Sequence, residues 1–98
     1  MKKQEVEILT HRLQKDGKLN FPVSPFIGGL ICGSIYRAKR RNIDDLNHSL
    51  KHRVLCRMNK TYRELTDFAQ TIGIENLDAS QSTPNEKGEI FLVFSLKM

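Results

Sequence analysis

The sequence predicts a single α+β domain, and three observations support this prediction. Apolar residues recur every three or four positions between residues 25 and 72, which is the period of one helical face. Two short segments, 18–23 and 89–96, are rich in the apolar residues typical of strands. The length of 98 residues suits one modest core. We therefore expect residues 1–98 to form one domain.

The first segment, residues 5–13, fits a helix and a strand equally well. As a helix, its apolar residues would share one face and Gly17 would end it. As a strand, it would turn at Asp16 and Gly17 into a second strand at 18–23. The sequence leaves both interpretations open.

The two ends of the chain are expected to meet in a small antiparallel sheet. Residues 89–96 read Glu-Ile-Phe-Leu-Val-Phe-Ser-Leu, a composition typical of a strand. A lone strand leaves its backbone N–H and C=O groups unpaired, so it needs a partner. Residues 18–23 are the other convincing strand. Residues 75–88 are polar and contain Gly and Pro, which predicts a loop with at most a short turn of helix.

A proline-containing joint follows the first strand. Ser24 can cap a helix that begins at Pro25. The Phe21–Pro22 bond is a candidate for the cis form, because a bond preceding proline has only a small preference for trans. A prolyl isomerase is accordingly one candidate partner at Phe21 and Pro22.

Three helices are expected, over residues 25–40, 43–58 and 61–72. The first is apolar all round in its first half, which predicts burial. Asn42 is expected to cap the second, whose apolar residues keep a helical period. The sequence Thr-Tyr-Arg-Glu is a capping box for the third, and Gly73 should end it.

The predicted core follows the apolar periods of these helices and of the last strand. Its members would fill the space between the helices and the sheet. They are Phe26, Leu30, Ile35, Ile43, Leu46, Leu50, Val54, Leu65, Phe68, Ile72, Phe91 and Val93.

The chain is basic, and its positive charge lies in the first part. The net charge is +5; residues 1–60 hold thirteen Lys or Arg against five Asp or Glu, and residues 61–98 hold three against six. This distribution indicates an anionic partner, either nucleic acid or an acidic protein surface. The candidate partner-binding residues are Arg37, Lys39, Arg40, Arg41, Lys51, Arg53 and Arg57.

No catalytic, metal-binding or cofactor motif is evident. Asp44, His48, His52 and Cys56 recur every four residues, but the zinc motif H-E-x-x-H needs a Glu where Ser49 stands. This row fits a polar boundary beside the core. His52 and Cys56 share a helical face without an oxyanion loop or a third orienting residue. We expect a protein that is not an enzyme and that uses no metal or cofactor.

The sequence also bears on the compartment. Charged residues follow the initial Met-Lys-Lys, which is unlike a signal peptide. The longest apolar stretch, residues 23–36, is too short to span a bilayer and contains three Gly. We expect a cytoplasmic protein with no membrane partner. Its two Cys are then reduced thiols.

A helix-turn-helix motif is half present. Residues 65–74 match its first helix and turn, with an Ala four positions before a Gly. The second helix would cover residues 75–82, which contain two acids and no Lys or Arg. A helix that reads DNA needs hydrogen-bond donors for bases and phosphates.

The length, the basic segment 37–60 and the lack of a catalytic motif resemble the small anti-RecBCD accessory proteins of temperate phages. The resemblance concerns overall character and assigns no role to a single residue. It implies a non-enzymatic protein that binds a host protein complex acting on DNA, the RecBCD-like helicase–nuclease, and modulates it. If the protein is phage-encoded, its compartment is the host cytoplasm. Its contact would be a basic helical surface. The alternative is a direct nucleic-acid-binding protein or a helix-turn-helix-like transcription regulator.

Overall fold

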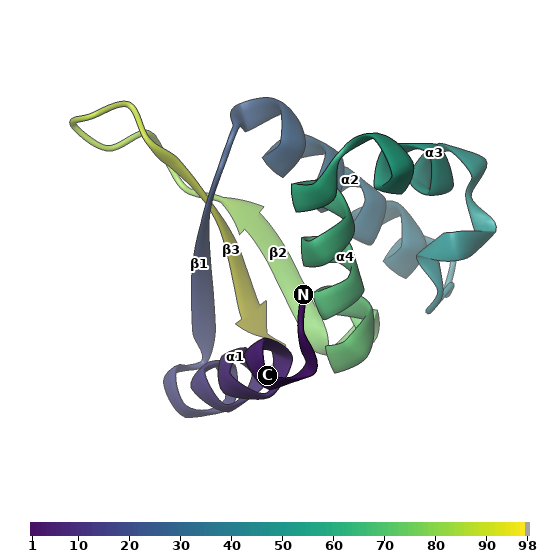
Figure 1. Cartoon of the computed structure of the whole chain (residues 1–98), viewed down its shortest axis with the longest axis horizontal. Coiled ribbons are helices and arrows are strands. Elements are labelled where there is room, and N and C mark those ends of the chain that lie inside the picture. Colours follow the sequence, from purple (N-terminus) through teal and green to yellow (C-terminus); the bar gives the residue numbers. More distant parts are fainter. Residues whose placement is uncertain (98) are drawn as a thin grey trace.

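The computed structural model describes residues 1–97 and confirms the predicted α+β class (Figure 1). The main elements are α1 (Lys3–Asp16), β1 (Lys18–Val23), α2 (Pro25–Arg40), α3 (Leu50–Met58), α4 (Lys60–Ile72), β2 (Leu77–Gln81) and β3 (Ile90–Leu96). Between α2 and α3 lies a short 3-10 helix, η1 (Leu46–His48), and another, η2 (Ile74–Asn76), precedes β2. Within the described residues, three strands form one antiparallel sheet in the order β1-β3-β2, and the helices lie mainly on one side of it.

The first segment is a helix, which decides between the two interpretations of residues 5–13. Leu13 is fully buried and fixes α1 against the rest of the molecule. Gly17 ends the helix with φ +79°, and its N–H donates to the Leu13 carbonyl at 2.8 Å. This left-handed conformation is one that Gly adopts without the steric penalty of a side chain.

The sheet joins both ends of the chain, as predicted, and contains a third strand. β3 pairs with β1 from Ser95 opposite Lys18 to Ile90 opposite Val23. On its other side β3 pairs with β2, which lies in the segment predicted to be a loop. The loop prediction is wrong for residues 77–81, because β2 is an edge strand with mostly polar, exposed side chains, and its fully buried residue is Leu77.

The face of β3 that packs into the core is the opposite of the predicted one. Leu92 and Phe94 are fully buried, whereas Phe91 and Val93 are only half-buried on the other face. Side chains alternate between the faces of a strand, so pairing in register decides which set enters the core. Here Phe94 lies opposite Leu19 of β1, which is also buried. Both faces of β3 are apolar in sequence, so its composition did not indicate the correct one.

The core lies between the sheet and helices α2 and α4. Phe21, Phe68 and Phe94 form its aromatic centre, with ring centroids 5.7 to 6.1 Å apart. These offset and edge contacts are favourable geometries for aromatic pairs. Of the predicted helical core residues, Ile35, Leu46, Leu65 and Phe68 are buried, and Leu30, Ile43 and Ile72 are half-buried.

The predicted helix 43–58 is wrong in its first half. α3 begins only at Leu50, and Ser49 caps it by accepting a hydrogen bond from the His52 N–H at 3.3 Å. Asn42 has φ +55° and is not a cap. The Asp45 carboxylate accepts from the Asn47 N–H at 2.9 Å and caps η1 instead. Asp and Ser side chains offer the backbone local bonds that compete with a continuous helix.

Three residues predicted to be in the core are exposed. Leu50 and Val54 lie on the outer face of α3 with 68% and 43% exposure, and Phe26 of α2 is 71% exposed. The helical period of these residues is real, but the face of α3 that the molecule covers is the one containing His52. The apolar period therefore showed correctly which residues of α3 share a face, but the prediction that this face packs in the core was wrong.

The Phe21–Pro22 bond is trans, like every peptide bond within residues 1–97, so the candidate cis form is not adopted. Pro22 lies on the edge strand β1 opposite Phe91, where proline is tolerated because it needs no ladder N–H. Its side chain is exposed, and contact with a prolyl isomerase stays a prediction.

Candidate partner-binding surface

Helices α3 and α4 are joined by a single residue, Asn59. Its backbone is extended, with φ −137° and ψ 115°, and its side chain caps α4 by accepting from the Tyr62 N–H at 2.8 Å. The chain therefore changes direction between the two helices (Figure 1). As a result α4 packs on the sheet while α3 lies at the periphery.

A line of polar side chains fixes α3 to α4 and α2. His52 Nδ1 of α3 lies 2.9 Å from the Tyr62 hydroxyl of α4, which lies 3.0 Å from Ser34 Oγ of α2. Cys56 Sγ lies 3.3 Å from His52 Nε2. Because Tyr62 and His52 are both buried, these bonds are protected from water. The position of α3 thus depends on hydrogen bonds as well as on apolar packing.

Burial sets the protonation of this network. Desolvation lowers the pKa of His52, and the charges of Asp67 and Asp45 partly oppose this. Burial raises the pKa of Cys56 and of Tyr62. A neutral imidazole beside a protonated thiol is a hydrogen-bonded pair and lacks the thiolate that a reactive cysteine needs. The pair is therefore best described as structural.

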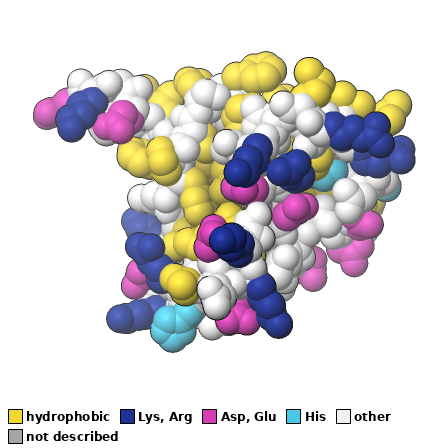
Figure 2. All heavy atoms as spheres, viewed as in Figure 1, with side chains coloured by type: hydrophobic (Ala, Val, Ile, Leu, Met, Phe, Trp, Pro, Cys, Tyr) yellow, Lys and Arg dark blue, Asp and Glu magenta, His cyan; other side chains and the backbone are white. Residues whose placement is uncertain are grey.

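The outer face of α3 carries a row of exposed apolar side chains. Leu50, Val54 and Met58 are 68%, 43% and 78% exposed and stand four residues apart, so they follow one face of the helix. We call these three residues the α3 stripe. Figure 2 shows apolar side chains along the edge of the molecule that α2 and α3 form. A contiguous exposed apolar row of this kind marks an interaction site more often than scattered residues do.

Three of the predicted partner-binding residues flank the α3 stripe. Lys51, Arg53 and Arg57 are all exposed, and the nine residues of α3 contain no Asp or Glu. Lys and Arg side chains gather over this part of the molecule in Figure 2. The surface of α3 is therefore both apolar and cationic.

Three further predicted residues lie at the end of α2. Arg40 lies over the ring of Tyr36, with its guanidinium carbon 5.9 Å from the ring centroid. Arg37 and Arg41 are one helical turn apart and both line a cavity between α2 and the start of α3. All three Arg are exposed at this end of the helix.

The seventh predicted residue, Lys39, has a structural role. Its ammonium group lies 2.8 Å from the Asp78 carboxylate and donates to the Leu77 carbonyl. The bond to Lys39, together with its charge, lowers the pKa of Asp78. Lys39 thus ties α2 to β2.

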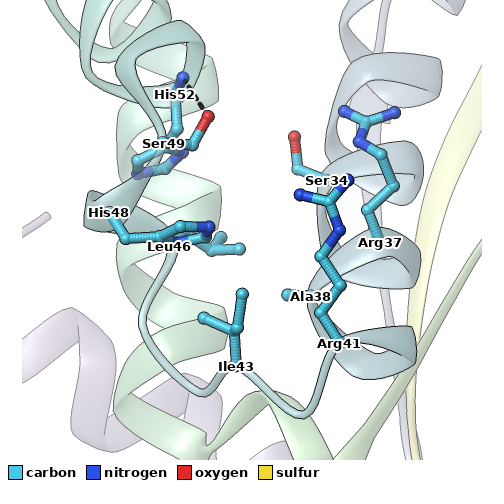
Figure 3. Close-up of a pocket in the computed structure, with 9 residues that line it drawn as sticks. All are labelled: Ser34, Arg37, Ala38, Arg41, Ile43, Leu46, His48, Ser49 and His52. Carbon is cyan, nitrogen blue, oxygen red and sulfur yellow. Dashed lines mark hydrogen bonds between the residues drawn. The ribbon is translucent and has the colours of Figure 1, made fainter.

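The cavity beside Arg37 and Arg41 has a volume of about 60 Å³ (Figure 3). Part of its wall is apolar, formed by Ala38, Ile43 and Leu46. Sequence reasoning missed this cavity, because it depends on how the chain folds back between α2 and α3. Its polar lining consists of Ser34, Arg37, Arg41, His48, Ser49 and His52.

Two motif hypotheses fail on secondary structure. Asp44 and His48 precede α3, so the row of polar residues ending at Cys56 does not lie on one helix. Within residues 1–97, no three His, Cys, Asp or Glu side chains are grouped as metal ligands. The would-be second helix of the helix-turn-helix motif forms η2 and β2 instead.

Searches against protein families, curated proteins and solved structures found no match for this chain. Among residues 1–97, no helix is long and apolar enough to cross a membrane.

Proposed function

We propose that this chain is a non-enzymatic modulator that binds a host protein acting on DNA, through the α3 stripe and the cations around it. The observation that carries this proposal is the exposure of Leu50, Val54 and Met58 in one row. Apolar surface that folding leaves in water is favourably buried when a partner covers it. An amphipathic helix face of this kind suits a groove on another protein.

The chemistry of α3 defines the partner's surface. The apolar row calls for an apolar groove, and the flanking Lys51, Arg53 and Arg57 call for carboxylates at its rim. Arg pairs with carboxylates through two parallel hydrogen bonds and is enriched at protein interfaces. A phosphate backbone would satisfy the cations and leave the apolar row without a partner. The combination favours a protein with an acidic, apolar groove.

The class of partner follows from the resemblance to phage anti-RecBCD proteins, and a RecBCD-like helicase–nuclease is the first candidate. A small protein can modulate such an enzyme by occupying a surface, without chemistry of its own. The network of His52 and Tyr62 supports this role, because it holds α3 in a fixed orientation before binding.

The test is binding to purified RecBCD, with nuclease activity on linear duplex DNA as the second readout. Val54→Glu places a charge in the middle of the α3 stripe and should abolish binding and modulation. Ile8→Glu is the matched control, because Ile8 is 60% exposed on α1, at the other end of the molecule (Figure 1). Equal binding by both variants would remove the α3 stripe from the proposal. Absence of binding by the unchanged protein would reject RecBCD as the partner.

A second candidate function is direct binding of nucleic acid. It is favoured by Arg37, Arg40 and Arg41, which are exposed together at the end of α2. Reversing Arg40 and Arg41 to Glu should weaken binding under either proposal. Salt separates them, because phosphate contacts release counterions and weaken steeply as salt rises, whereas an apolar interface persists. Tight, salt-sensitive DNA binding that Val54→Glu leaves intact would favour this second function.

A further inference from the structure

We propose that the cavity between α2 and the residues leading into α3 binds a phosphate group, either free inorganic phosphate or the phosphate of a mononucleotide. This inference goes beyond the proposed function, because it concerns a small ligand and requires no protein partner. It rests on a pair of arginines, on polar groups on the opposite wall, and on the space between them (Figure 3).

Arg37 and Arg41 form one wall. Arg37 lies in the last turn of α2 and Arg41 is its C-cap, four residues later, a spacing at which like charges repel each other. The ion pairs found among residues 1–97 join Lys39 to Asp78, and Glu64 to Lys60 and the N-terminus, so they leave both arginines without a carboxylate. An anion between the two guanidinium groups would remove this repulsion and accept their N–H donors.

The opposite wall adds polar groups from a different part of the chain. His48 Nδ1–H donates to the Asp45 carbonyl at 2.8 Å, so Nε2 of the neutral ring is an acceptor, which can take the proton of a P–O–H group. In Figure 3 the His48 ring and the Arg41 guanidinium extend toward each other from the two walls. Hydroxyl groups of Ser34 and Ser49 complete the polar lining. Among residues 1–97, no Asp or Glu lines the cavity, so an anion placed there meets no carboxylate from this part of the chain.

The start of α3 contributes to the same cavity. Ser49 and His52, its cap and third residue, both line the space. The first N–H groups of a helix are unsatisfied within the helix and favour negative charge. This helix end adds to a site that the arginine pair already defines.

The size and shape of the site favour phosphate. About 10–15 Å³ of such space holds one water, so the volume of about 60 Å³ has room for several water molecules or one compact oxyanion. A carboxylate is planar and presents two oxygens. Phosphate presents oxygens in tetrahedral directions and can accept from both walls together.

The test is a titration of the full chain with inorganic phosphate, followed by ¹H–¹⁵N correlation spectra at constant ionic strength. Saturable shifts are expected at the amides of Ser34, Arg41 and Ser49. The double variant Arg37→Gln with Arg41→Gln should bind phosphate about tenfold more weakly or worse. Arg40→Gln is the matched control, because it removes one charge from the same helix end at a residue outside the cavity lining.

Two comparisons identify the ligand. Adenosine 5′-monophosphate that binds as tightly as inorganic phosphate assigns the site to the phosphate group alone, and tighter binding assigns it to a mononucleotide. Acetate that competes equally with phosphate would overturn the phosphate assignment in favour of carboxylate.

Three further outcomes bear on the proposal. Absence of saturable shifts would overturn it, and so would equal weakening by Arg40→Gln, which would indicate non-specific attraction. Unchanged spectra away from the cavity show that the double variant is folded. The binding of Val54→Glu to RecBCD is measured separately, so failure of either proposal is distinguishable from failure of the other.

Discussion

Helices α3 and α4 are neighbours in the chain with opposite relations to the core. Both carry apolar residues at a helical period, and one residue separates them. α4 buries Leu65 and Phe68 between the sheet and α2, whereas α3 leaves Leu50 and Met58 largely exposed. The covered face of α3 instead presents His52 to the Tyr62 hydroxyl.

In both helices the apolar period identifies a face that favours burial, but it does not show which part of this chain, or which other molecule, buries that face. In α4 the cover is the sheet of the same chain. In α3 the same kind of face points to solvent, because hydrogen bonds fix the opposite side of the helix. We infer that the cover of α3 is supplied by another molecule.

The largest effect on stability is expected from truncating a buried side chain of α4. Phe68→Ala should lower the free energy of unfolding by about 3–5 kcal/mol, because it leaves a cavity beside Phe21 and Phe94. Leu50→Ala should change it by about 0.5 kcal/mol or less, because Leu50 is exposed. Urea denaturation followed by circular dichroism measures both. Similar losses for the two variants would show that α3 packs as α4 does.

A smaller effect is expected from breaking the polar line that holds α3. Tyr62→Phe removes the hydroxyl shared by His52 and Ser34 and should destabilise the fold by about 1–3 kcal/mol. Amide hydrogen exchange should accelerate in α3 more than in α4 or the sheet. Uniform acceleration across all helices would mean that this hydroxyl supports the whole core equally.

Local sequence signals predicted much of the fold. Ser24 accepts from the Ile27 N–H at 3.2 Å, as a helix cap should, and α2 covers the predicted residues 25–40. β1 likewise has its predicted bounds, 18–23. The facing of β3 and the existence of β2 were not predictable in this way, because both depend on pairing between residues far apart in the sequence.

For the candidate site, the sequence predicted which residue types are present but not how they are arranged in space. The cations between residues 37 and 57 were visible in the sequence, but their division among an ion pair, a cavity wall and the border of the α3 stripe was not. That division depends on the bend before α3, where Asp45 and Ser49 replace a continuous helix with local caps. The sequence signal for this later helix start was Ser49, because a serine at the N-cap accepts a hydrogen bond from the N–H three residues later, here that of His52.

Acid should loosen α3 through His52. Its pKa is lowered by burial, so the unfolded chain binds a proton more readily than the folded one. The contribution of neutral His52 to the free energy of unfolding is therefore complete above the ordinary histidine pKa of about 6.5, and it falls as the pH drops below that value. Asp45 and Asp67 reduce the shift, and His48 adds to it.

The measurement is the free energy of unfolding near pH 7.5 and near pH 5.5, for the unchanged protein and for His52→Gln. The unchanged protein should lose more stability than the variant over this interval. Equal losses would place the acid sensitivity in other groups. Measurement at constant ionic strength keeps general charge effects the same in both proteins.

The smallest effects on stability are expected at two adjacent glycines of α2, the helix that packs against α4 and lines the cavity. Gly29→Ala should stabilise the protein by about 0.5–1 kcal/mol, because the added carbon meets open space and the helix gains propensity. In Gly28→Ala the same carbon would collide with the Gln81 amide and crowd Val23 at 3.1 Å. That amide donates to the Pro25 carbonyl at 3.0 Å, so the collision disturbs a bond between β2 and α2. Thermal unfolding should rank Gly29→Ala above Gly28→Ala, and the reverse order would show that β2 moves freely relative to α2.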